Sequence, residues 1–387
     1  MKKILVFSAY YLPGYKGGGP IRCIENTVKA LKNDFEFSIV TSDRDLGDKT
    51  KYQGIENDKW TQLNGTEVYY SKPGLLSLFS LIKTLKNKDF DLFYFNSFFS
   101  WKFTILPLIL IKMRLLRNKS IVLAPRGEFS NGALNLKSNK KKLFINLSRI
   151  LGLYKNILWQ ASSNFEVQDI ENQIGRYVEV KVAPEIPSYI EDVFQNKRFN
   201  KNVGEVRLIF LSRISPKKNL IGALELLRKV KGRVIFSIFG PIEDKIYWEK
   251  CKNVISGMPN NIKVIYEGSI DHNSVYKRLA ENHFFFLPTH GENFGYVIIE
   301  ALTVGCPVII SDQTPWRSLE EKGCGWDLSL DSQNEIISIL ERCVGMDKIQ
   351  YEIMSTKAYD YGKQYLNNDE TIKKTQALFN HPLNKFT

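Results

Sequence analysis

The sequence predicts two α/β domains, each a parallel sheet wrapped by helices, and three observations support this. The chain has 387 residues, more than a single hydrophobic core usually serves. In the first half, short β-rich runs alternate with helical patterns, as in a parallel sheet. The alternation begins again after the proline-bearing stretch Val182–Pro187 and the polar stretch Gln195–Gly204. We therefore expect Rossmann-like domains at 1–184 and 185–359.

The first domain is predicted from short runs of apolar and β-branched residues and from apolar residues at helical spacing. Strands are expected at Ile4–Ala9, Phe35–Thr41, Thr66–Ser71, Asp91–Phe95, Ser120–Ala124 and Asn156–Ala161. Helices are expected at Ile21–Leu31, Leu75–Leu85, Lys102–Leu116, Lys140–Leu151 and Glu166–Ile174. This order favours a parallel sheet with helical crossovers.

The second domain repeats the pattern. Strands are expected at Arg207–Leu211, Val234–Phe239, Lys263–Tyr266, Phe284–Pro288 and Pro307–Ser311. Helices are expected at Asn219–Lys229, Asp244–Val254, Ser274–Glu281 and Phe294–Val304. The polar tail is helical to about Asn380, and its last part, 360–387, is expected to pack back on the first domain. Because ligands bind at the carboxyl ends of parallel strands, the loops there should converge on a cleft between facing domains.

Composition excludes several classes of protein. The five cysteines form no CxxC pair, so neither a disulfide framework nor a zinc site is expected. The four histidines show no ligand spacing, so we expect no metal. The apolar start, Ile4–Ala9, is too short for a signal peptide and leads directly into Tyr10–Gly14. The longest apolar run, Phe103–Ile111, is far below the ~20 residues of a membrane span, so we expect a cytoplasmic protein.

Positive charge is concentrated in the segment 101–160. The chain has a net charge of +13, and this segment holds twelve basic residues and one acid, Glu128, a net +11. The basic residues are Lys102, Lys112, Arg114, Arg117, Lys119, Arg126, Lys137, Lys140, Lys141, Lys142, Arg149 and Lys155. Apolar side chains lie between them, at Phe103–Ile111 and Leu143–Ile145. We expect either docking on an anionic membrane surface or a solvated basic face over a buried helix. Nucleic acid binding ranks below both, since no nucleic-acid module is present.

Two carboxylates eight positions apart, Glu292 and Glu300, are the most informative motif. Glu292 lies in a polar, glycine-flanked loop, and Glu300 lies on the predicted helix Phe294–Val304, which Gly305 ends. Free N–H groups at the start of that helix would face a ligand beside Glu292. Glu300 would lie about two turns further on. One carboxylate can hold sugar hydroxyls and the other a ribose, as a nucleotide sugar requires.

Two other loops carry groups suited to a diphosphate. Gly14–Pro20 follows the first strand, and its glycines let the backbone approach a phosphate at a helix start. Ser212–Asn219 follows the first strand of the second domain. In it, Arg213 offers a bidentate fork and Lys218 a point charge. Both cations would neutralise the charge that builds on a phosphate leaving group.

Other kinds of chemistry are not indicated. Asp43 and Asp45 form a DxD pattern, which in metal-dependent transferases can hold a divalent ion. Two acids in a polar loop are usually a solvated turn, and we predict that here. No Ser-His-Asp set appears, and no cysteine stands in a nucleophile context. The expected site binds and stabilises charge, with the leaving phosphate as the base.

Taken together, these motifs resemble the retaining nucleotide-sugar glycosyltransferases of family 4, which have the two-domain GT-B fold. The motifs that occur in the family's order are Glu292-x7-Glu300, Arg213-x4-Lys218, Phe239–Pro241 and Gly305–Ile309. Ala124–Gly127 and Ser311–Arg317 look like a bacterial branch that makes O-antigen, capsule or exopolysaccharide.

The resemblance implies a role for each matching position. Gly18 and Gly19 would approach the diphosphate, Arg213 and Lys218 would bind it, and no metal would be needed. Glu292 would hold the donor sugar and Glu300 the ribose. A further sugar contact would come from Asn96, where many relatives have histidine, or from Arg126. The remaining positions implied at the donor site are Gly240, His290, Asn293, Phe294 and Gly295.

We therefore expect an enzyme that transfers a hexose or N-acetylhexosamine from a UDP-sugar with retention. The acceptor would be a glycan on a polyprenyl-diphosphate lipid at the inner face of a bacterial membrane, with 101–160 on that surface. Two alternatives remain: a non-hydrolysing sugar-nucleotide epimerase of the same fold, which needs acid–base groups around the sugar, and a non-enzymatic basic membrane-binding protein.

Overall fold

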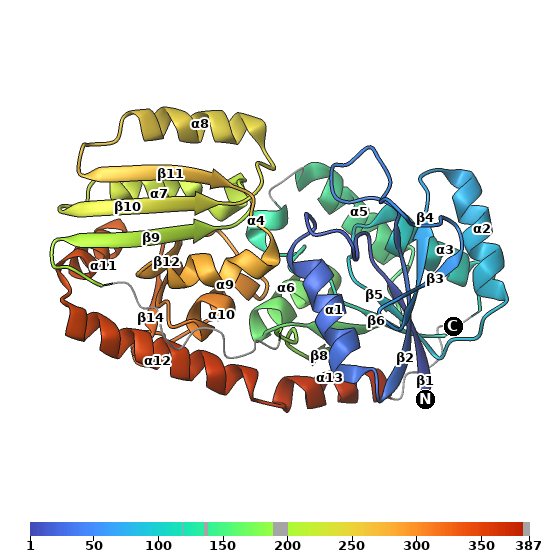
Figure 1. Cartoon of the computed structure of the whole chain (residues 1–387). Helices are drawn as coiled ribbons and strands as arrows, with labels where there is room; N and C mark the ends of the chain where they lie inside the picture. Colours follow the sequence, from blue (N-terminus) through green and yellow to red (C-terminus); the bar gives the residue numbers. More distant parts are fainter. Residues whose placement is uncertain (118, 135–137, 189–199, 382–387) are drawn as a thin grey trace. The chain divides into compact units, whose positions relative to one another are not determined.

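The chain divides into two compact units in a computed structural model that describes residues 1–117, 119–134, 138–188 and 200–381 (Figure 1). Unit 1 comprises Met1–Ser188 and Asp369–Thr387, and unit 2 comprises Tyr189–Asn368. Residues 189–199, which include part of the predicted connection, lie outside the described residues.

Unit 1 is built on one sheet with the strand order β3-β4-β2-β1-β5-β6-β7-β8. Its strands are β1 (Lys2–Phe7), β2 (Phe35–Ser42), β3 (Trp60–Leu63), β4 (Thr66–Ser71), β5 (Leu92–Phe95), β6 (Ser120–Leu123), β7 (Leu158–Ala161) and β8 (Glu179–Val182). Neighbouring strands are parallel except β3 and β4. The two edge strands, β3 and β8, are short and partly exposed, which explains why their apolar pattern was too weak to predict them.

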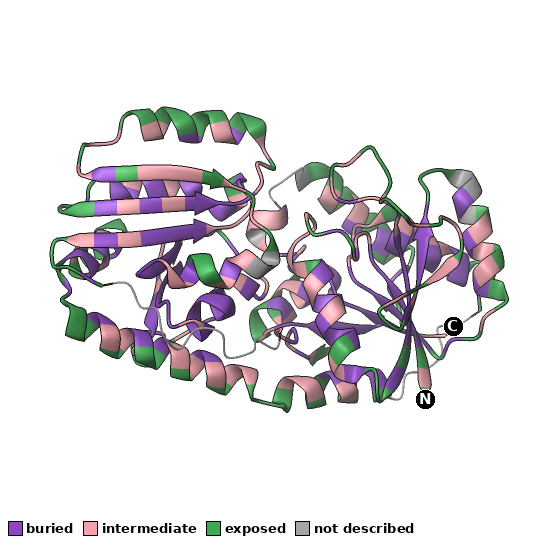
Figure 2. Cartoon of the chain, in the orientation of Figure 1, coloured by how far each residue is buried: buried purple, intermediate pink, exposed green. Residues whose placement is uncertain are grey.

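Both faces of this sheet are covered, because successive side chains of a strand point to opposite faces. In β1, Leu5 and Phe7 belong to one hydrophobic cluster, and Ile4 and Val6 belong to another. Figure 2 shows the strands buried and the outer sides of the helices exposed. This double burial is typical of parallel sheets, whose strands are near-continuous apolar runs.

The helices of unit 1 mostly match the predicted ones. They are α1 (Gly19–Leu31), α2 (Leu75–Lys86), α3 (Leu106–Lys112), α4 (Asn131–Leu134), α5 (Ser138–Ile150), α6 (Asn164–Ile174) and α13 (Glu370–Asn380). Helix α13 packs on the cluster around Ile4, where the Phe379 ring meets Phe35, Phe37 and Tyr94 edge-on.

The prediction of one continuous helix at Lys102–Leu116 was wrong. The segment begins as a π-helical turn at Trp101–Ile105 and continues as α3 to Lys112. The cause is Pro107, which has no N–H to donate to the carbonyl four residues earlier and would clash with it. The turn is wider there, and the Ile105 N–H donates to the Ser100 carbonyl at 3.0 Å. Beyond Lys112, Arg114 takes a left-handed conformation that ends the helix.

Unit 2 has a parallel sheet with the strand order β11-β10-β9-β12-β13-β14. Its strands are β9 (Glu205–Leu211), β10 (Arg233–Phe239), β11 (Ile262–Gly268), β12 (Phe284–Leu287), β13 (Val308–Ser311) and β14 (Gly325–Leu328). Its helices are the short 3-10 turn η2 (Pro216–Lys218) and α7 (Leu220–Leu227), α8 (Lys245–Ser256), α9 (His272–Ala280), α10 (Tyr296–Thr303), α11 (Gln333–Gly345) and α12 (Lys348–Leu366). Strand β14 and helix α11 were not predicted.

The polar tail forms two helices instead of one stretch. Helix α12 belongs to unit 2 and α13 to unit 1, so the part that joins unit 1 begins at Asp369, nine residues after the predicted start of the returning helix. Within the described part of the chain, no helix is both long and apolar enough to cross a bilayer.

Candidate functional site

The predicted cation Lys218 and the predicted carboxylate Glu292 form an ion pair in unit 2. Lys218 ends η2, the first helical turn after β9, and Glu292 lies in the loop after β12. Strands β9 and β12 are neighbours in the sheet, so their carboxyl ends bring the two loops together. Only 8% of Lys218 is exposed, which makes this pair much less screened by water than a surface pair.

Backbone and side-chain hydrogen bonds hold these two loops in place. The Asn219 amide donates to the Pro288 carbonyl at 2.8 Å and its oxygen caps α7 by accepting from the Gly222 N–H. The His290 N–H donates to the Lys217 carbonyl at 2.8 Å, and the Glu292 N–H donates to the Gln313 carbonyl at 3.0 Å. Asn219 was not predicted as a site residue; it was predicted to begin the helix that it caps in the structure.

Arg213 also lies in the loop after β9, but it has a different partner. Its guanidinium contacts the Glu243 carboxylate at 2.6 Å, and both side chains are more than one-third exposed. A pair this exposed stabilises the fold little. Arg213 can therefore exchange Glu243 for an anionic ligand at a small cost in stability. Lys218, by contrast, stays paired with the largely buried Glu292.

Glu300 lies on α10, one turn past its start, and is 3% exposed. Helix α10 begins at Tyr296, two residues later than predicted, because Gly295 takes a left-handed conformation as its cap. The Phe294 side chain is buried against Tyr296 and Trp316, and its carbonyl accepts from the Trp316 indole at 2.6 Å. The Phe294 ring is therefore packed inside unit 2, so a ligand contact of this residue would have to come from its backbone.

The other predicted positions around Glu292 differ in exposure. The His290 side chain is exposed, and Asn293 is half-buried.

Of the remaining histidines, His283 accepts from the Arg207 N–H, and burial lowers the pKa of its ring to about 4, so it stays neutral inside unit 2. The described residues contain no cluster of three or more His, Cys, Asp or Glu side chains that could hold a metal ion.

Gly240 occupies a position of close backbone approach. Its φ is +139°, and a Cβ there would lie 1.9 Å from the Ser212 carbonyl oxygen. Its N–H donates to the Gly268 carbonyl at 2.8 Å. Gly240 therefore packs the loop after β10 against the loop that carries Arg213, and a contact between its N–H and a ligand would compete with the bond to Gly268.

Gly240→Ala is expected to destabilise unit 2 by about 3 kcal/mol or more, because the left-handed strain adds to a clash with rigid backbone. Chemical denaturation measures the loss. Gly268→Ala is the matched control, since φ is +79° there and a Cβ meets no atom within 4 Å. That variant should lose only about 1–2 kcal/mol from strain. Equal losses in the two variants would contradict the close-approach explanation.

In unit 1, the two predicted sugar contacts, Asn96 and Arg126, touch each other. The Arg126 guanidinium donates to the Asn96 side-chain oxygen at 2.8 Å and pairs with the Glu185 carboxylate at 3.4 Å. It also donates to the Tyr94 hydroxyl, whose pKa burial raises. Arg126 is in a left-handed conformation and its side chain is almost fully buried. The sequence carried no signal for Glu185, which lies in the segment expected to be a connection.

The glycine loop lies as predicted between β1 and α1. Gly18 has φ +68° and caps α1, and its N–H donates to the Tyr15 carbonyl at 3.1 Å. Gly19 is the first residue of α1, where backbone N–H groups have no partner within the helix. The solvated turn predicted at Asp43 and Asp45 was wrong, because both carboxylates are buried.

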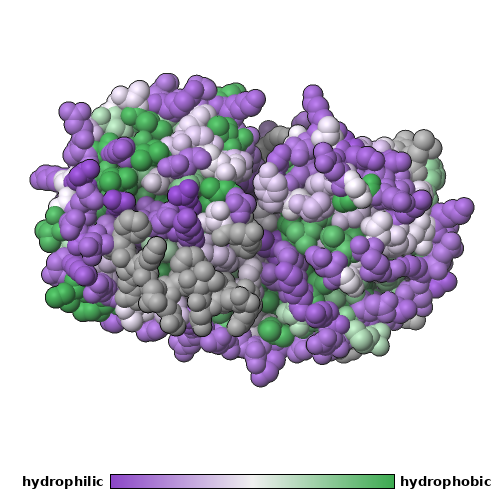
Figure 3. All heavy atoms as spheres, viewed as in Figure 1, coloured by the Kyte–Doolittle hydropathy of each residue, from purple (hydrophilic) through white to green (hydrophobic). Residues whose placement is uncertain are grey.

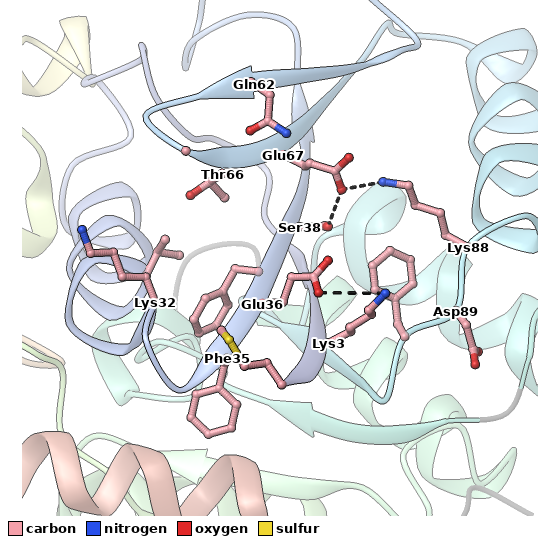
Figure 4. Close-up of a pocket in the computed structure, with 15 residues that line it drawn as sticks. Lys3, Lys32, Phe35, Glu36, Ser38, Gln62, Thr66, Glu67, Lys88 and Asp89 are labelled. Carbon is pink, nitrogen blue, oxygen red and sulfur yellow. Dashed lines mark hydrogen bonds and ion pairs between the residues drawn. The ribbon is translucent and has the colours of Figure 1, made fainter.

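One cavity in unit 1 lies at the amino ends of its strands, opposite to the end that carries the glycine loop (Figure 4). It has a volume of about 500 Å³, and its lining includes Lys3, Phe35 and Glu67, at the amino ends of β1, β2 and β4. The Lys88 ammonium pairs with Glu67, as the dashed line in Figure 4 shows. Ligands of parallel sheets bind at the carboxyl ends, so this cavity is not the predicted site.

Part of unit 2 matches a known protein family. Residues 192–325 match the family model described as Glycosyl transferases group 1. Unit 2 carries a group 1 glycosyltransferase domain. The match to the group 1 domain spans Arg213, Lys218, Glu292 and Glu300, the four charged residues predicted for the donor.

The proteins that match beyond this domain are distant in sequence. A protein described as an uncharacterized 41.2 kDa protein in the cps region of Klebsiella pneumoniae is 24% identical over 275 residues, which cover 69% of this chain and 73% of the relative. Among solved structures, sucrose-phosphate synthase from Thermosynechococcus elongatus has a TM-score of 0.72 at 13% identity over 97% of this chain and 98% of its own. Anabaena HepE in complex with UDP and glucose has a TM-score of 0.68 at 16% identity over 98% of both chains. These likenesses confirm the predicted GT-B fold.

Proposed function

We propose that the protein is a retaining glycosyltransferase that moves a hexose or N-acetylhexosamine from a UDP-sugar to a lipid-linked glycan. The observation that carries this proposal is the largely buried Lys218–Glu292 pair within the group 1 domain, with Arg213 on the same loop as Lys218. HepE, a structural neighbour, was solved with UDP and glucose, which supports a UDP-sugar donor. The relative from a cps region supports a role in bacterial surface polysaccharide synthesis.

The proposed chemistry relies on charge already present in the protein. Lys218 and Arg213 would neutralise the diphosphate as the bond to the sugar breaks, which stabilises the transition state electrostatically. Glu292, held by Lys218, would accept hydrogen bonds from donor-sugar hydroxyls, and Glu300 would accept them from the ribose. The released phosphate would take the proton of the acceptor hydroxyl. These cations would make a divalent metal unnecessary.

The N-terminal unit would supply the remaining contacts. Gly18 and Gly19 would face the diphosphate, and the sugar contact is assigned to Asn96 or to Arg126, which touch each other. The acceptor would be a glycan on a polyprenyl diphosphate, so the enzyme would work at a membrane surface. The structure supports such attachment through α5, although through other residues than predicted.

The apolar run Phe103–Ile111, predicted as part of the membrane surface, is mostly core. Phe103, Ile105, Leu108 and Ile111 are buried in unit 1. Exposed apolar residues instead form a stripe on α5 and just beyond it, the α5 stripe: Leu143, Leu147, Ile150 and Leu151. Their spacing of four, three and one places them on one side of a helix. Leu143 is 69% and Ile150 82% exposed. Figure 3 shows one face of the molecule, on which hydrophilic residues make up most of the surface.

Cations flank the α5 stripe. Lys140, Lys142 and Arg149 are exposed on the same helix, and the Lys112 ammonium donates to the Leu151 carbonyl. That bond brings the exposed Met113 at the end of α3 near the end of the stripe. The single acid of the segment 101–160, Glu128, faces inward and accepts hydrogen bonds from the Ser97 hydroxyl and from the Phe98 and Phe99 N–H groups. Lys137 lies outside the described residues. An apolar stripe between cations fits a bilayer with anionic headgroups.

Leu147→Glu with Ile150→Glu should weaken binding to phosphatidylcholine vesicles that contain phosphatidylglycerol by roughly tenfold or more, because two aliphatic side chains no longer enter the interface. Co-sedimentation measures the binding. The control is Ile246→Glu, which changes an isoleucine in unit 2 that is 74% exposed, between the values for Leu147 and Ile150. Equal binding of the double variant and the control would contradict docking through α5.

The donor site is tested by thermal shift of the full chain against UDP, GDP, ADP, TDP and several UDP-sugars, with and without EDTA. A ligand that binds the folded state raises the melting temperature as RT ln(1 + [L]/Kd). A selective response to UDP that survives EDTA is expected. No response to any nucleotide would overturn the proposal. A response that EDTA removes would overturn its metal-independent chemistry.

A further inference from the structure

We infer that Asp45 is a positioning residue for the glycine loop, Gly14–Gly19, and that it holds this loop in the conformation that meets the donor diphosphate. The inference rests on the proposed function, which assigns the loop to the diphosphate. It begins from a pattern in the sequence, Asp43-Arg44-Asp45, that the proposed chemistry does not use.

The Asp45 carboxylate binds the backbone of the loop directly. One oxygen accepts from the Tyr15 N–H at 2.7 Å and the Lys16 N–H at 2.9 Å, and the other accepts from the Leu46 N–H at 2.7 Å. Asp45 is 4% exposed. Three N–H donors on a buried carboxylate form strong, charge-assisted bonds. The two bonds from Tyr15 and Lys16 join the segment after β2 to a loop about thirty residues earlier.

The loop lies closely over this segment. A Cβ on Gly14 would lie 2.2 Å from the Tyr52 hydroxyl oxygen and 3.0 Å from Cγ of Asp45, so residue 14 has room only for glycine. The Lys16 ammonium pairs with Asp48 at 2.6 Å. The Tyr70 hydroxyl donates to the Leu12 carbonyl at 2.7 Å. The contacts at Gly14, Tyr15 and Lys16 thus hold the first half of the loop on the segment 45–52.

These bonds determine which N–H groups remain for an anion. Asp45 takes those of Tyr15 and Lys16, and the Tyr15 carbonyl takes that of Gly18. The N–H groups of Gly17 and Gly19 have no hydrogen bond to another described residue. Asp45 thus engages the first N–H groups of the loop and leaves those of Gly17 and Gly19 for an anion at the start of α1, where positive helix-end charge favours one.

Asp43 provides a control with the same chemistry. It is also buried, but its oxygens accept from the Arg44 guanidinium and the Asn57 amide, and none of these groups belongs to the glycine loop. Asp43→Asn therefore removes a buried carboxylate from the same segment without releasing the loop. A general loss of stability would appear in both variants, whereas a positioning effect would appear in one.

The experiment compares the affinities of the full chain for UDP and for uridine, which lacks the diphosphate, by calorimetry. Asp45→Ala is expected to weaken UDP binding by roughly tenfold and to change uridine binding less than about twofold. Asp45→Asn should lose less, since its amide oxygen can still accept from the two loop N–H groups. Gly14→Ala, which displaces the loop from Tyr52, should lower the ratio of UDP to uridine affinity as much as Asp45→Ala does.

Each outcome is decisive. A preserved ratio of UDP to uridine affinity in Asp45→Ala, or an equal change in Asp43→Asn, would overturn the positioning role. Tighter UDP binding in Asp45→Ala and Asp45→Asn would also overturn it, because Asp45 would then act by repelling the diphosphate. If the wild-type chain binds neither UDP nor uridine, the proposed donor site fails. Failure of the positioning role looks different: the wild-type chain then binds UDP, and Asp45→Ala keeps the wild-type ratio of UDP to uridine affinity.

Discussion

Lys218→Met should reduce transfer from the UDP-sugar by roughly 10²–10³-fold, the loss typical when one group that stabilises transition-state charge is removed. The substitution keeps the length of the side chain and deletes its charge. It also leaves the mostly buried Glu292 carboxylate without its cation, which should destabilise unit 2 by about 3–5 kcal/mol. Release of UDP from the best-binding UDP-sugar measures the activity, and calorimetry measures the stability.

A double variant separates the two effects. Lys218→Met with Glu292→Gln removes both charges, so the uncompensated carboxylate disappears and much of the stability should return. Activity should stay low, because neither the cation for the diphosphate nor the carboxylate for the sugar is restored. Activity of Lys218→Met within tenfold of wild type would show that Lys218 only holds Glu292. Recovery of activity in the double variant would show that the single change acted through folding.

Glu300→Gln should weaken UDP binding by roughly 10–100-fold, because hydrogen bonds from hydroxyls to a carboxylate contribute about 1.5–3 kcal/mol. The change keeps the shape of a side chain that is 3% exposed on α10. The decisive comparison uses UDP and its 2′,3′-dideoxy analogue. Wild-type protein should bind the analogue more weakly than UDP, and the variant should bind the two about equally.

This comparison tests a direct contact, since a side chain that acts only on folding would weaken both ligands alike. The melting temperature of the ligand-free variant reports any cost to the fold. If the variant discriminates between UDP and the dideoxy analogue as strongly as wild type, Glu300 does not bind the ribose, and its burial on α10 serves the packing of unit 2.

The architecture was largely predictable because its signals are local. Strands such as Thr66–Ser71 hold β-branched and aromatic residues over a few consecutive positions, and the structure has that strand where it was predicted. Local patterns fail where a distant or covalent constraint intervenes. Pro107 divided a predicted helix into a π-helical turn and α3, and the edge strands β3 and β8 lacked the double burial that produces a clear apolar run.

The charged groups of the candidate site were named from the sequence, but their partners were not. The sequence by itself determined the alternation of strand and helix and placed Arg213, Lys218, Glu292 and Glu300 on or beside loops that follow strands. Periodicity and propensity involve neighbours along the chain, so a sequence displays them directly.

Only the tertiary structure decided which of these groups meet. It paired Lys218 with Glu292 across 74 residues, joined Arg126 to Asn96 and Glu185, and buried Asp45 under the glycine loop. It also buried Phe103–Ile111 for the most part and left Leu143 and Ile150 on the surface. Such contacts depend on the order in which strands assemble into a sheet, and that order is a property of the whole chain.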